Sequence, residues 1–429
     1  MRRTVAEHQA AVTGLLRWSS GYDDSPPDVL GLSAALGRTL AEDIHAPVSV
    51  PPFDNSQMDG YAVHAADLGA ASALVVADAI PAGSVPPGLE AGTAAPIMTG
   101  AMLPAGAAAV VPIERAEPPQ FYSAADRLDG EVTVQLPADI EAGLFVRRAG
   151  SDIAEGDVAL GAGTLLGPAQ LGLLAACGVG TVPVRPRFRV LLLSTGDEVA
   201  EPGAPLAPGT IYDANTTLLE AALGDAGAEV SRHRLLGDDP AVLREAFDAI
   251  TEGSTHLILS TGGISQGAYE VVKQALADSS VEFSSVAMQP GGPQAHGTIS
   301  GIPFLGFPGN PVSALVSFEM FLRPALQQLT GSPAPRLVLD AVLVDAAQSP
   351  AAKHQVRRGL YRNGKVVLVG GPDSHLLHAL ASSNCLVHLP EGVASLQQGD
   401  HVEVTLIGPV PADPFAVEEL LVTEVAGTD

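Results

Sequence analysis

The stretch that most constrains the fold of this chain runs from His256 to Tyr269 and reads HLILSTGGISQGAY. Branched apolar residues at 257–259 stop abruptly at Ser260-Thr261-Gly262-Gly263, and apolar residues recur with helical spacing from Val271 to Leu276. The pattern predicts a strand, a glycine turn and the start of a helix. Adjacent glycines let the backbone approach a ligand closely, and the unpaired N–H groups of a helix's first turn favour an anion. A strand-to-helix turn without any ligand explains the stretch equally well.

Strand-like and helical patterns alternate on both sides of this stretch, from Arg187 to Gly331. Apolar runs with the length of strands are found at 188–193, 230–236 and 257–259. Helical spacing of apolar residues is found at Asp213–Gly227, at 243–250, at 271–276 and after Pro308-Gly309-Asn310-Pro311. Repeated strand-then-helix units predict a doubly wound, mainly parallel sheet with helices on both faces.

Ligands of such sheets collect at the carboxyl ends of the strands. This rule predicts one polar edge made of Thr195 to Glu198, Asp238 and Asp239, Thr261 to Ser265, and Pro308 to Asn310. Asp238 or Asp239 equally fits a cap for the helix that Pro240 begins, and Asp197 and Glu198 equally fit a turn. Several carboxylates beside a glycine-lined anion pocket nevertheless indicate Mg²⁺ held against phosphate.

Composition narrows the class of partner. The 429 residues are 46% hydrophobic and include 48 acidic against 22 basic residues, which gives a net charge of −26. Such a charge repels nucleic acid and anionic lipid surfaces. No basic-then-apolar signal opens the chain and no apolar run is long enough to span a membrane, so we expect a folded cytoplasmic protein of several domains. Cys177 and Cys385 match no metal-ligand spacing, and we expect buried free thiols.

The flanking regions have other patterns. Thr4 and Glu7 have the spacing of a capping box and predict an opening helix, and a second helix is predicted from Ser33 to Ile44. Short apolar runs between Ala73 and Val146 predict a small, mostly β module, and Pro168 begins a helix that reaches Cys177. Four strand-like runs predict a C-terminal β barrel or sandwich, at 338–344, 365–369, 385–389 and 401–406.

The segment PPFDNSQMDGYAV, residues 51–63, gathers Asp54, Asn55, Ser56 and Asp59 without strand or helix periodicity. Short polar side chains of this kind commonly build turns, so a turn is the simpler interpretation and a site the alternative. The basic pair Arg147-Arg148 likewise has two interpretations. It solvates the end of a strand or it holds an anion.

Seven motifs, taken together and in this order, resemble those of the molybdopterin molybdenumtransferases, which are the MoeA proteins and the E domain of gephyrin. They are PPFDNSQMDGYAV, IMTGA at Ile97, VRRAGSDI at Val146, STGDEV at Ser194, IYDAN at Ile211, STGGIS at Ser260 and GFPGNPVSA at Gly306. The resemblance implies an L-shaped homodimer of α/β multidomain subunits. It implies an N-terminal linker domain with helices (1–49 plus 147–184), a small β domain (50–146), a doubly wound α/β domain (185–331) and a C-terminal β barrel (332–429).

The resemblance also implies an activity. Proteins of this family insert molybdate into adenylylated molybdopterin and release AMP with a divalent cation, taken here as Mg²⁺, at a site between the α/β domain of one subunit and the small β module of the other. Carried over, the catalytic residues are Asp59, Thr99, Asp152 and Glu198. The metal ligands are Glu198, Asp238, Asp239 and Glu270, the last in place of an aspartate. The substrate-binding and phosphate-binding residues are Thr195, Gly196, Thr261, Gly262, Gly263, Ser265, Lys273, Pro308, Gly309 and Asn310.

One departure from the family concerns charge. The stretch MQPGGP carries Gln289 and Gly292 where the family usually has two lysines. Losing two cations from a phosphate site weakens substrate affinity or abolishes catalysis, unless a residue such as Lys273 substitutes for them. A gephyrin-like dimeric scaffold that binds protein partners is therefore the alternative function. A third interpretation, an adenylylating enzyme built on the α/β domain alone, fits this chain less well. Such an enzyme lacks the N-terminal, small β and C-terminal modules that this chain has.

Overall fold

The computed structural model describes residues 2–69, 72–122, 131–195, 199–235, 255–262, 275–276, 279–332 and 334–409, together with Glu245. Contacts divide the chain into two compact units. The first unit is built from Met1–Asp28, Gly37–Thr39 and Arg185–Asp429. The second is built from Val29–Leu36 and Leu40–Val184.

A seven-stranded sheet forms the centre of the first unit. In spatial order its strands are β1 (Arg2–Arg3), β18 (Glu282–Val286), β20 (Pro293–Ile299), β21 (Ile302–Phe307), β17 (Leu257–Thr261), β13 (Arg189–Thr195) and β16 (Glu229–Leu235). The four strands from β21 to β16 run parallel, while β18, β20 and β21 are joined by antiparallel pairing. The predicted mainly parallel sheet is therefore confirmed, and the hairpin of β20 and β21 is an addition that the sequence patterns did not reveal.

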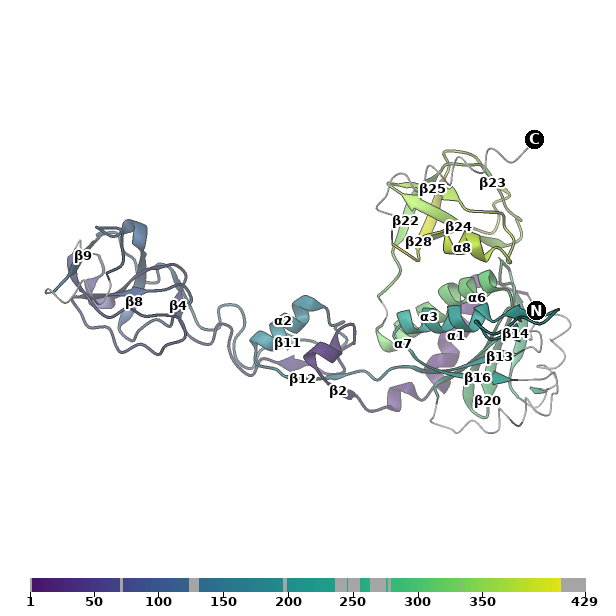
Figure 1. Cartoon of the computed structure of the whole chain (residues 1–429), viewed down its shortest axis with the longest axis horizontal. Helices are drawn as coiled ribbons and strands as arrows, with labels where there is room; N and C mark the ends of the chain where they lie inside the picture. The colour runs from purple at the N-terminus through teal and green to yellow at the C-terminus, as the bar shows by residue number, and fades with distance from the viewer. Residues whose placement is uncertain are drawn as a thin grey trace. The chain divides into compact units, whose positions relative to one another are not determined.

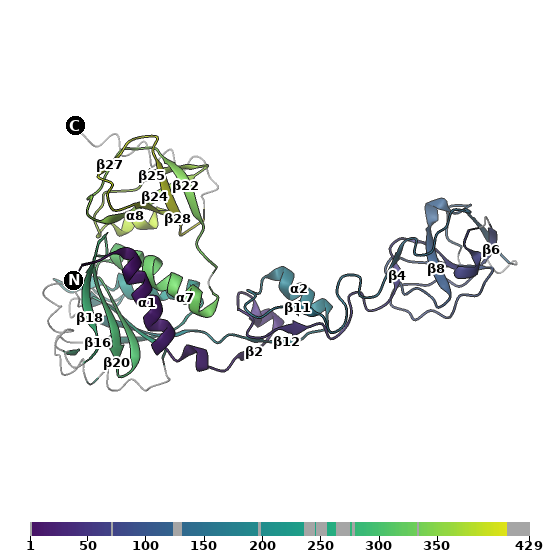
Figure 2. The same cartoon turned by 180° about the vertical axis from the view of Figure 1, so that it is seen from behind.

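One face of this sheet is covered by helices α1 (Val5–Ser19), α3 (Ala214–Asp225), α6 (Pro311–Ser317) and α7 (Arg323–Thr330), with the π-helix η6 (Phe318–Leu322) between the last two. Figures 1 and 2 show these helices gathered on the same side of the strands. Leu192 and Leu259 are paired across β13 and β17 and enter the same core as Leu219 and Leu326 of the helices. The predicted capping box begins α1, because Thr4 Oγ1 accepts from the Glu7 N–H at 3.2 Å and Glu7 accepts from the Thr4 N–H at 2.8 Å.

The opposite face of the sheet buries Leu193, Ile258 and Phe304, which alternate along their strands with the residues of the first core. Two further predicted helices, at 243–250 and 271–276, lie outside the described residues apart from Glu245 and residues 275–276. Helices on both faces therefore stay a prediction.

A closed five-stranded barrel follows the sheet in the chain. Its strands are β22 (Val338–Leu343), β24 (His354–Arg362), β25 (Lys365–Leu368), β26 (Cys385–Leu389) and β28 (His401–Leu406). The barrel closes because β24 pairs with both β25 and β26. The predicted C-terminal barrel is confirmed, and Cys385 is a buried free thiol inside it. A short strand, β19 (Met288–Gln289), pairs with β24, and helix α8 (Leu377–Ala381) precedes β26.

The second unit contains a five-stranded sheet whose spatial order is β8 (Ala107–Pro112), β5 (Gly60–His64), β7 (Thr93–Ile97), β6 (Ser72–Val76) and β9 (Thr133–Leu136). A pair of short strands, β4 (Asn55–Ser56) and β10 (Val146–Arg147), adjoins it in the chain. The remaining elements are β2 (Asp28–Gly31), β3 (Ile44–His45), β11 (Val158–Leu160), helix α2 (Pro168–Ala176) and β12 (Thr181–Val184). The mostly β module and the helix begun by Pro168 are confirmed, and Cys177 is buried and free. The four domain boundaries stay predictions.

The helix predicted from Ser33 to Ile44 is wrong. Only a short 3₁₀ helix, η2 (Leu32–Ala35), forms there, and Gly37 then turns the chain with a φ of +73°. Leu40 instead forms a bridge with Val184 of the distant strand β12. Pairing between residues far apart in the sequence thus overrides the local helical spacing.

Candidate functional site

The polar edge predicted from the sequence lies at the carboxyl ends of the parallel strands. Thr195 is paired with Leu235 at the end of β16, Ser194 with Thr261, and Thr261 with Phe307 at the end of β21. The strand ends therefore meet at one edge of the sheet, and Pro308 directly follows that edge. This placement of Thr195, Thr261 and residues 308–310 agrees with the prediction. Their role in binding a substrate stays a prediction.

Two loops approach each other closely at this edge. Gly262 has a φ of +84°, a conformation that glycine adopts without strain. A Cβ atom added to Gly309 would lie 3.4 Å from the Cα atom of Gly262, so the two backbones are almost in contact. Asn215 reinforces the arrangement, because its Nδ2 donates to the Gly309 carbonyl oxygen at 2.6 Å.

Two polar atoms at this edge are buried without a hydrogen-bond partner among the described residues. They are the hydroxyl of Thr261, whose side chain is 2% exposed, and Oδ1 of Asn215. A buried polar group that is left unpaired costs about 1–3 kcal/mol, so such atoms are uncommon in folded proteins. Their position beside the glycine turn fits a polar ligand that completes both.

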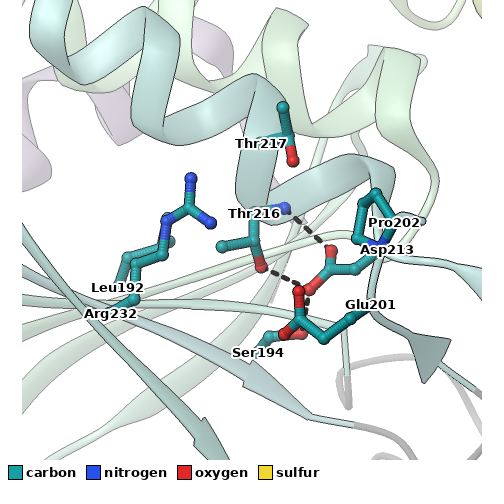
Figure 3. A pocket seen from close by; sticks show the side chains of 8 residues that line it. All are labelled: Leu192, Ser194, Glu201, Pro202, Asp213, Thr216, Thr217 and Arg232. Atoms are coloured by element: carbon teal, nitrogen blue, oxygen red, sulfur yellow. Dashed lines mark hydrogen bonds between the residues drawn. The ribbon is translucent and has the colours of Figure 1, made fainter. Parts of the chain in front are cut away.

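Asp213 organises a small pocket beside the same edge (Figure 3). Its carboxylate accepts from Ser194 Oγ at 2.9 Å, from the Thr216 N–H at 2.9 Å and from Thr216 Oγ1 at 2.6 Å. It thereby caps α3 and fixes the end of β13 at once. The pocket has a volume of about 40 Å³, which is room for a few water molecules and not for a nucleotide. The sequence placed Asp213 in a family motif and gave it no role, although its position directly before a helix is that of a cap.

A loop of the C-terminal barrel reaches this edge as well. Ser374 Oγ accepts from Asn310 Nδ2 at 2.8 Å. Two buried arginines of β24 hold the loop by its carbonyl oxygens: Arg357 Nη2 donates to Gly370 at 2.8 Å, and Arg358 Nη1 donates to Asp373 at 3.1 Å. Burial lowers the pKa of both guanidinium groups. Sequence reasoning missed this contribution, because consecutive arginines are not a pattern of buried strands.

The two positions where the family usually has lysines are engaged in packing. Gln289 lies in β19, and its Oε1 accepts from Gln355 Nε2 at 3.3 Å. A Cβ atom on Gly292 would lie 3.3 Å from the carbonyl oxygens of Val286 and Met288, which is a tight fit. Both positions are therefore in contact with neighbouring groups, and neither leaves an empty space of the size of a lysine side chain. Lys273, the predicted substitute, lies outside the described residues.

The small β module places two predicted residues in direct contact. Asp59 Oδ1 accepts from both the backbone N–H and the hydroxyl of Thr99, each at 2.7 Å. These hydrogen bonds, that of the hydroxyl first, lower the pKa of Asp59. Asp152 is not one of these partners. It is exposed in the turn after β10, where its backbone N–H donates to the Val50 carbonyl at 3.0 Å.

Asp54 and Arg148, which the sequence left open to a structural or a binding role, are paired with each other. Arg148 Nη1 lies 2.6 Å from Asp54 Oδ2, and the Ala149 N–H donates to Asp54 Oδ1 at 2.8 Å. These contacts lower the pKa of Asp54, the backbone hydrogen bond from Ala149 contributing most. Arg148 therefore solvates a carboxylate at the end of a strand. The segment around Asp54 is not only a turn, because β4 and the first residues of β5 lie within it.

The predicted metal ligands lie in parts of the chain outside the described residues. Glu198, Asp238, Asp239 and Glu270 lie outside the described residues, as do Gly196, Gly263 and Ser265. Within the described part of the chain, no group of three His, Cys, Asp or Glu side chains is positioned to hold a metal ion. None of the described helices is both long and apolar enough to cross a membrane.

Three consecutive regions of the chain match known families. They are described as the MoeA N-terminal region (domain I and II) at residues 3–178, a probable molybdopterin binding domain at 191–328 and the MoeA C-terminal region (domain IV) at 340–407. The chain is 43% identical over 418 residues to molybdopterin molybdenumtransferase 2 of Mycobacterium tuberculosis, which covers 94% of this chain and 99% of that protein. It is 35% identical to the molybdopterin molybdenumtransferase of Haemophilus influenzae, over 88% of this chain and 93% of that protein.

Solved structures agree with this assignment. The molybdopterin biosynthesis MoeA protein of Pyrococcus horikoshii has a TM-score of 0.76 and 29% identity, and the match covers 95% of this chain and 100% of that chain. The curated relatives are named as transferases, so the scaffold alternative is not favoured. The resemblance drawn from the seven motifs is confirmed. The chain belongs to the molybdopterin molybdenumtransferase (MoeA) family.

Proposed function

We propose that this chain inserts molybdate into adenylylated molybdopterin and releases AMP. The observation that carries the proposal is the 43% identity, over 94% of the chain, to a protein named molybdopterin molybdenumtransferase 2. The reaction handles two oxyanions, a pyrophosphate and molybdate. An enzyme for it therefore needs preorganised donors for negative charge more than it needs a nucleophile.

The edge of the seven-stranded sheet supplies such donors in this proposal. The turn that begins at Thr261 and Gly262 binds phosphate through backbone N–H groups, and the unpaired Thr261 hydroxyl adds one more donor. Gly309 lies against Gly262 and narrows the opening, and Asn215 holds it in place. This chain thus relies on backbone and hydroxyl groups where its family usually has lysines.

Mg²⁺ is part of the proposal. The residues offered for it are all carboxylates, and oxygen ligands of this kind are the ones that Mg²⁺ prefers: Glu198, Asp238, Asp239 and Glu270. When bound, the ion neutralises and polarises the pyrophosphate. The ionised carboxylate of Asp59 accepts two hydrogen bonds from Thr99. In this proposal it is a catalytic residue that the small β module contributes to the site. We further propose a cytoplasmic homodimer, since the resemblance places the module of one subunit against the α/β domain of its partner.

The test is AMP release from adenylylated molybdopterin by the purified chain, with and without molybdate and Mg²⁺. Release that requires both is the expected result. Release that needs neither, or none from a folded protein, would contradict the proposal. None at all would make the loss of lysines at Gln289 and Gly292 decisive.

Variants separate the roles. Glu198→Gln and Glu270→Gln are each expected to weaken Mg²⁺-dependent release, while Glu155→Gln, which removes one exposed carboxylate elsewhere, is expected to leave it unchanged. Unchanged release in both site variants would refute the metal role. Gly263→Val is expected to weaken nucleotide binding by crowding the turn. Binding as tight as in the parent would show that the stretch is only a turn.

A further inference from the structure

Two histidines of the C-terminal barrel share a hydrogen bond, at a separation close to that of two ligands on one metal ion. His354 Nε2 and His388 Nδ1 are 3.1 Å apart, and their rings are nearly perpendicular at 85°. Two imidazole nitrogens that share a tetrahedral Zn²⁺ lie about 3.3 Å apart, because each is about 2.0–2.1 Å from the ion. The separation of the two nitrogens therefore already fits chelation.

Sheet register brings a carboxylate to the same face. His388 of β26 is directly opposite Glu403 of β28, and it is also opposite Val356 of β24. Because side chains alternate along a strand, His354, two residues before Val356, shares that face with Glu403. Side chains directly opposite each other have Cβ atoms about 5 Å apart, so the exposed Glu403 side chain can reach the pair by rotation.

A further side chain orients one of the imidazoles. His388 Nε2 lies 2.9 Å from Thr405 Oγ1, which is on the same face of β28. Metal-binding histidines commonly use their second ring nitrogen in this way, because the hydrogen bond fixes the ring and its tautomer.

One cavity, of about 390 Å³, lies between the barrel and the helices α1 and α7. Its barrel side is lined by His354, His388, Glu403 and Thr405. The opposite wall carries two cations that are already paired. Arg323 lies 2.8 Å from Asp225, and Arg336 lies 2.8 Å from Glu319. These charges cancel, and the negative charge of Glu403 remains to favour a cation.

We propose that His354, His388 and Glu403 form a binding site for a divalent transition metal of the zinc class, with water from the cavity completing the coordination. Within the described ranges, no three His, Cys, Asp or Glu side chains already stand close enough to hold a metal ion, so Glu403 turns inward on binding. The imidazole that donates the His354–His388 hydrogen bond moves its proton to its other ring nitrogen, which frees both facing nitrogens for the ion. The site differs from the proposed Mg²⁺ site, because imidazole ligands favour Zn²⁺, Co²⁺ or Cu²⁺ over Mg²⁺. A bound ion ties together three strands of the barrel.

The test uses the full chain without a purification tag, stripped of metal with a chelator. Titration calorimetry with Zn²⁺ at pH 7.5, with excess Mg²⁺ present to occupy the carboxylates of the proposed Mg²⁺ site, is expected to show one equivalent bound. Co²⁺ under the same conditions is expected to give the intense visible bands of four-coordination. His354→Gln and His388→Gln are each expected to weaken binding at least tenfold and to abolish those bands. Thr405→Val is expected to weaken it by about tenfold, since it acts through His388. Excess Mg²⁺ is expected not to compete.

The control is His45→Gln, an exposed histidine of the other unit, which is expected to bind Zn²⁺ like the parent. No stoichiometric binding by the parent would overturn the proposal, as would unchanged affinity in both barrel histidine variants. If those variants fail to fold, Glu403→Gln and Thr405→Val decide, because Glu403 is exposed and Thr405 half-buried. Unchanged Zn²⁺ affinity in both would then overturn the site. AMP release with Mg²⁺ is measured separately, so failure of this site and failure of the proposed transferase are distinguishable.

Discussion

Replacement of Asp213 tests whether one carboxylate holds the polar edge together. In Asp213→Ala the cap of α3 is lost, and so are the acceptors for the hydroxyls of Ser194 and Thr216. In Asp213→Asn one side-chain oxygen remains to accept from the Thr216 N–H, and the hydroxyls can accept from the new amide. The two variants therefore separate loss of the group from loss of its charge.

The expected cost follows from the three hydrogen bonds. Loss of a helix cap costs about 1 kcal/mol, and hydrogen bonds to a charged group contribute about 1.5–3 kcal/mol each. The pocket beside Asp213 admits water, which partly replaces the lost acceptor. We therefore expect local destabilisation of about 2–4 kcal/mol in Asp213→Ala and about 1 kcal/mol in Asp213→Asn.

Hydrogen exchange is the suitable assay, because a chain with several cores does not unfold in one step and has no single free energy of unfolding. Amides of α3 and β13 are expected to exchange about 30-fold faster or more in Asp213→Ala, since about 1.4 kcal/mol is tenfold. Thr217→Ala, a change at the exposed neighbouring threonine, is the control and is expected to stay within about threefold. Equal exchange in Asp213→Ala and the parent, or identical rates in the Ala and Asn variants, would refute the reasoning.

Three further changes have defined outcomes. Gly60→Ala places a Cβ atom 2.1 Å from the Val111 carbonyl oxygen, so we expect loss of about 3 kcal/mol or more and little soluble protein on expression. In the proposed function, Gln289→Lys returns one cation to the phosphate site at the expense of the hydrogen bond to Gln355, and it is expected to lower the KM for adenylylated molybdopterin about tenfold in steady-state kinetics. Thr99→Val removes the hydrogen bond that contributes most to the lowered pKa of Asp59, so that pKa rises towards its ordinary value and ionisation is lost at a higher pH. Carboxyl carbon NMR measures the shift, and an unchanged pKa would contradict it.

Periodicity predicted the parts of the fold that depend on local spacing of apolar residues. The strands β13 and β17 and the helix α3 were found because their apolar residues have the length and spacing of buried elements. The helix expected from Ser33 was wrong, because the bridge of Leu40 to Val184 joins residues that no local pattern connects. The strand β24 was missed because it buries Arg357 and Arg358, whose charges are met by a loop further along the chain.

The same division holds for the candidate site. Residues at strand ends were predictable, because parallel strands end together. The network of Asp213 with Ser194 and Thr216 was not, since a serine nineteen positions before an aspartate carries no local signal. The hydrogen bond from Asn310 to Ser374 joins the edge of the sheet to a loop of the barrel. It depends on how the barrel packs against the sheet, so no sequence motif predicts it.

The glycine turn after β17 was explained equally well by a bound anion and by a plain turn, and the anion stays a prediction that one buried hydroxyl supports. A plain turn has no reason to leave the hydroxyl of Thr261 buried and unpaired, because a buried unpaired group costs about 1–3 kcal/mol. The hydroxyl lies beside the turn at Gly262, which Gly309 approaches closely. A phosphate oxygen that accepts from the Thr261 hydroxyl would satisfy it, so its cost is recovered only when the site is occupied. Asn215 Oδ1 is an acceptor, so it calls for a donor on the ligand and not for the anion itself.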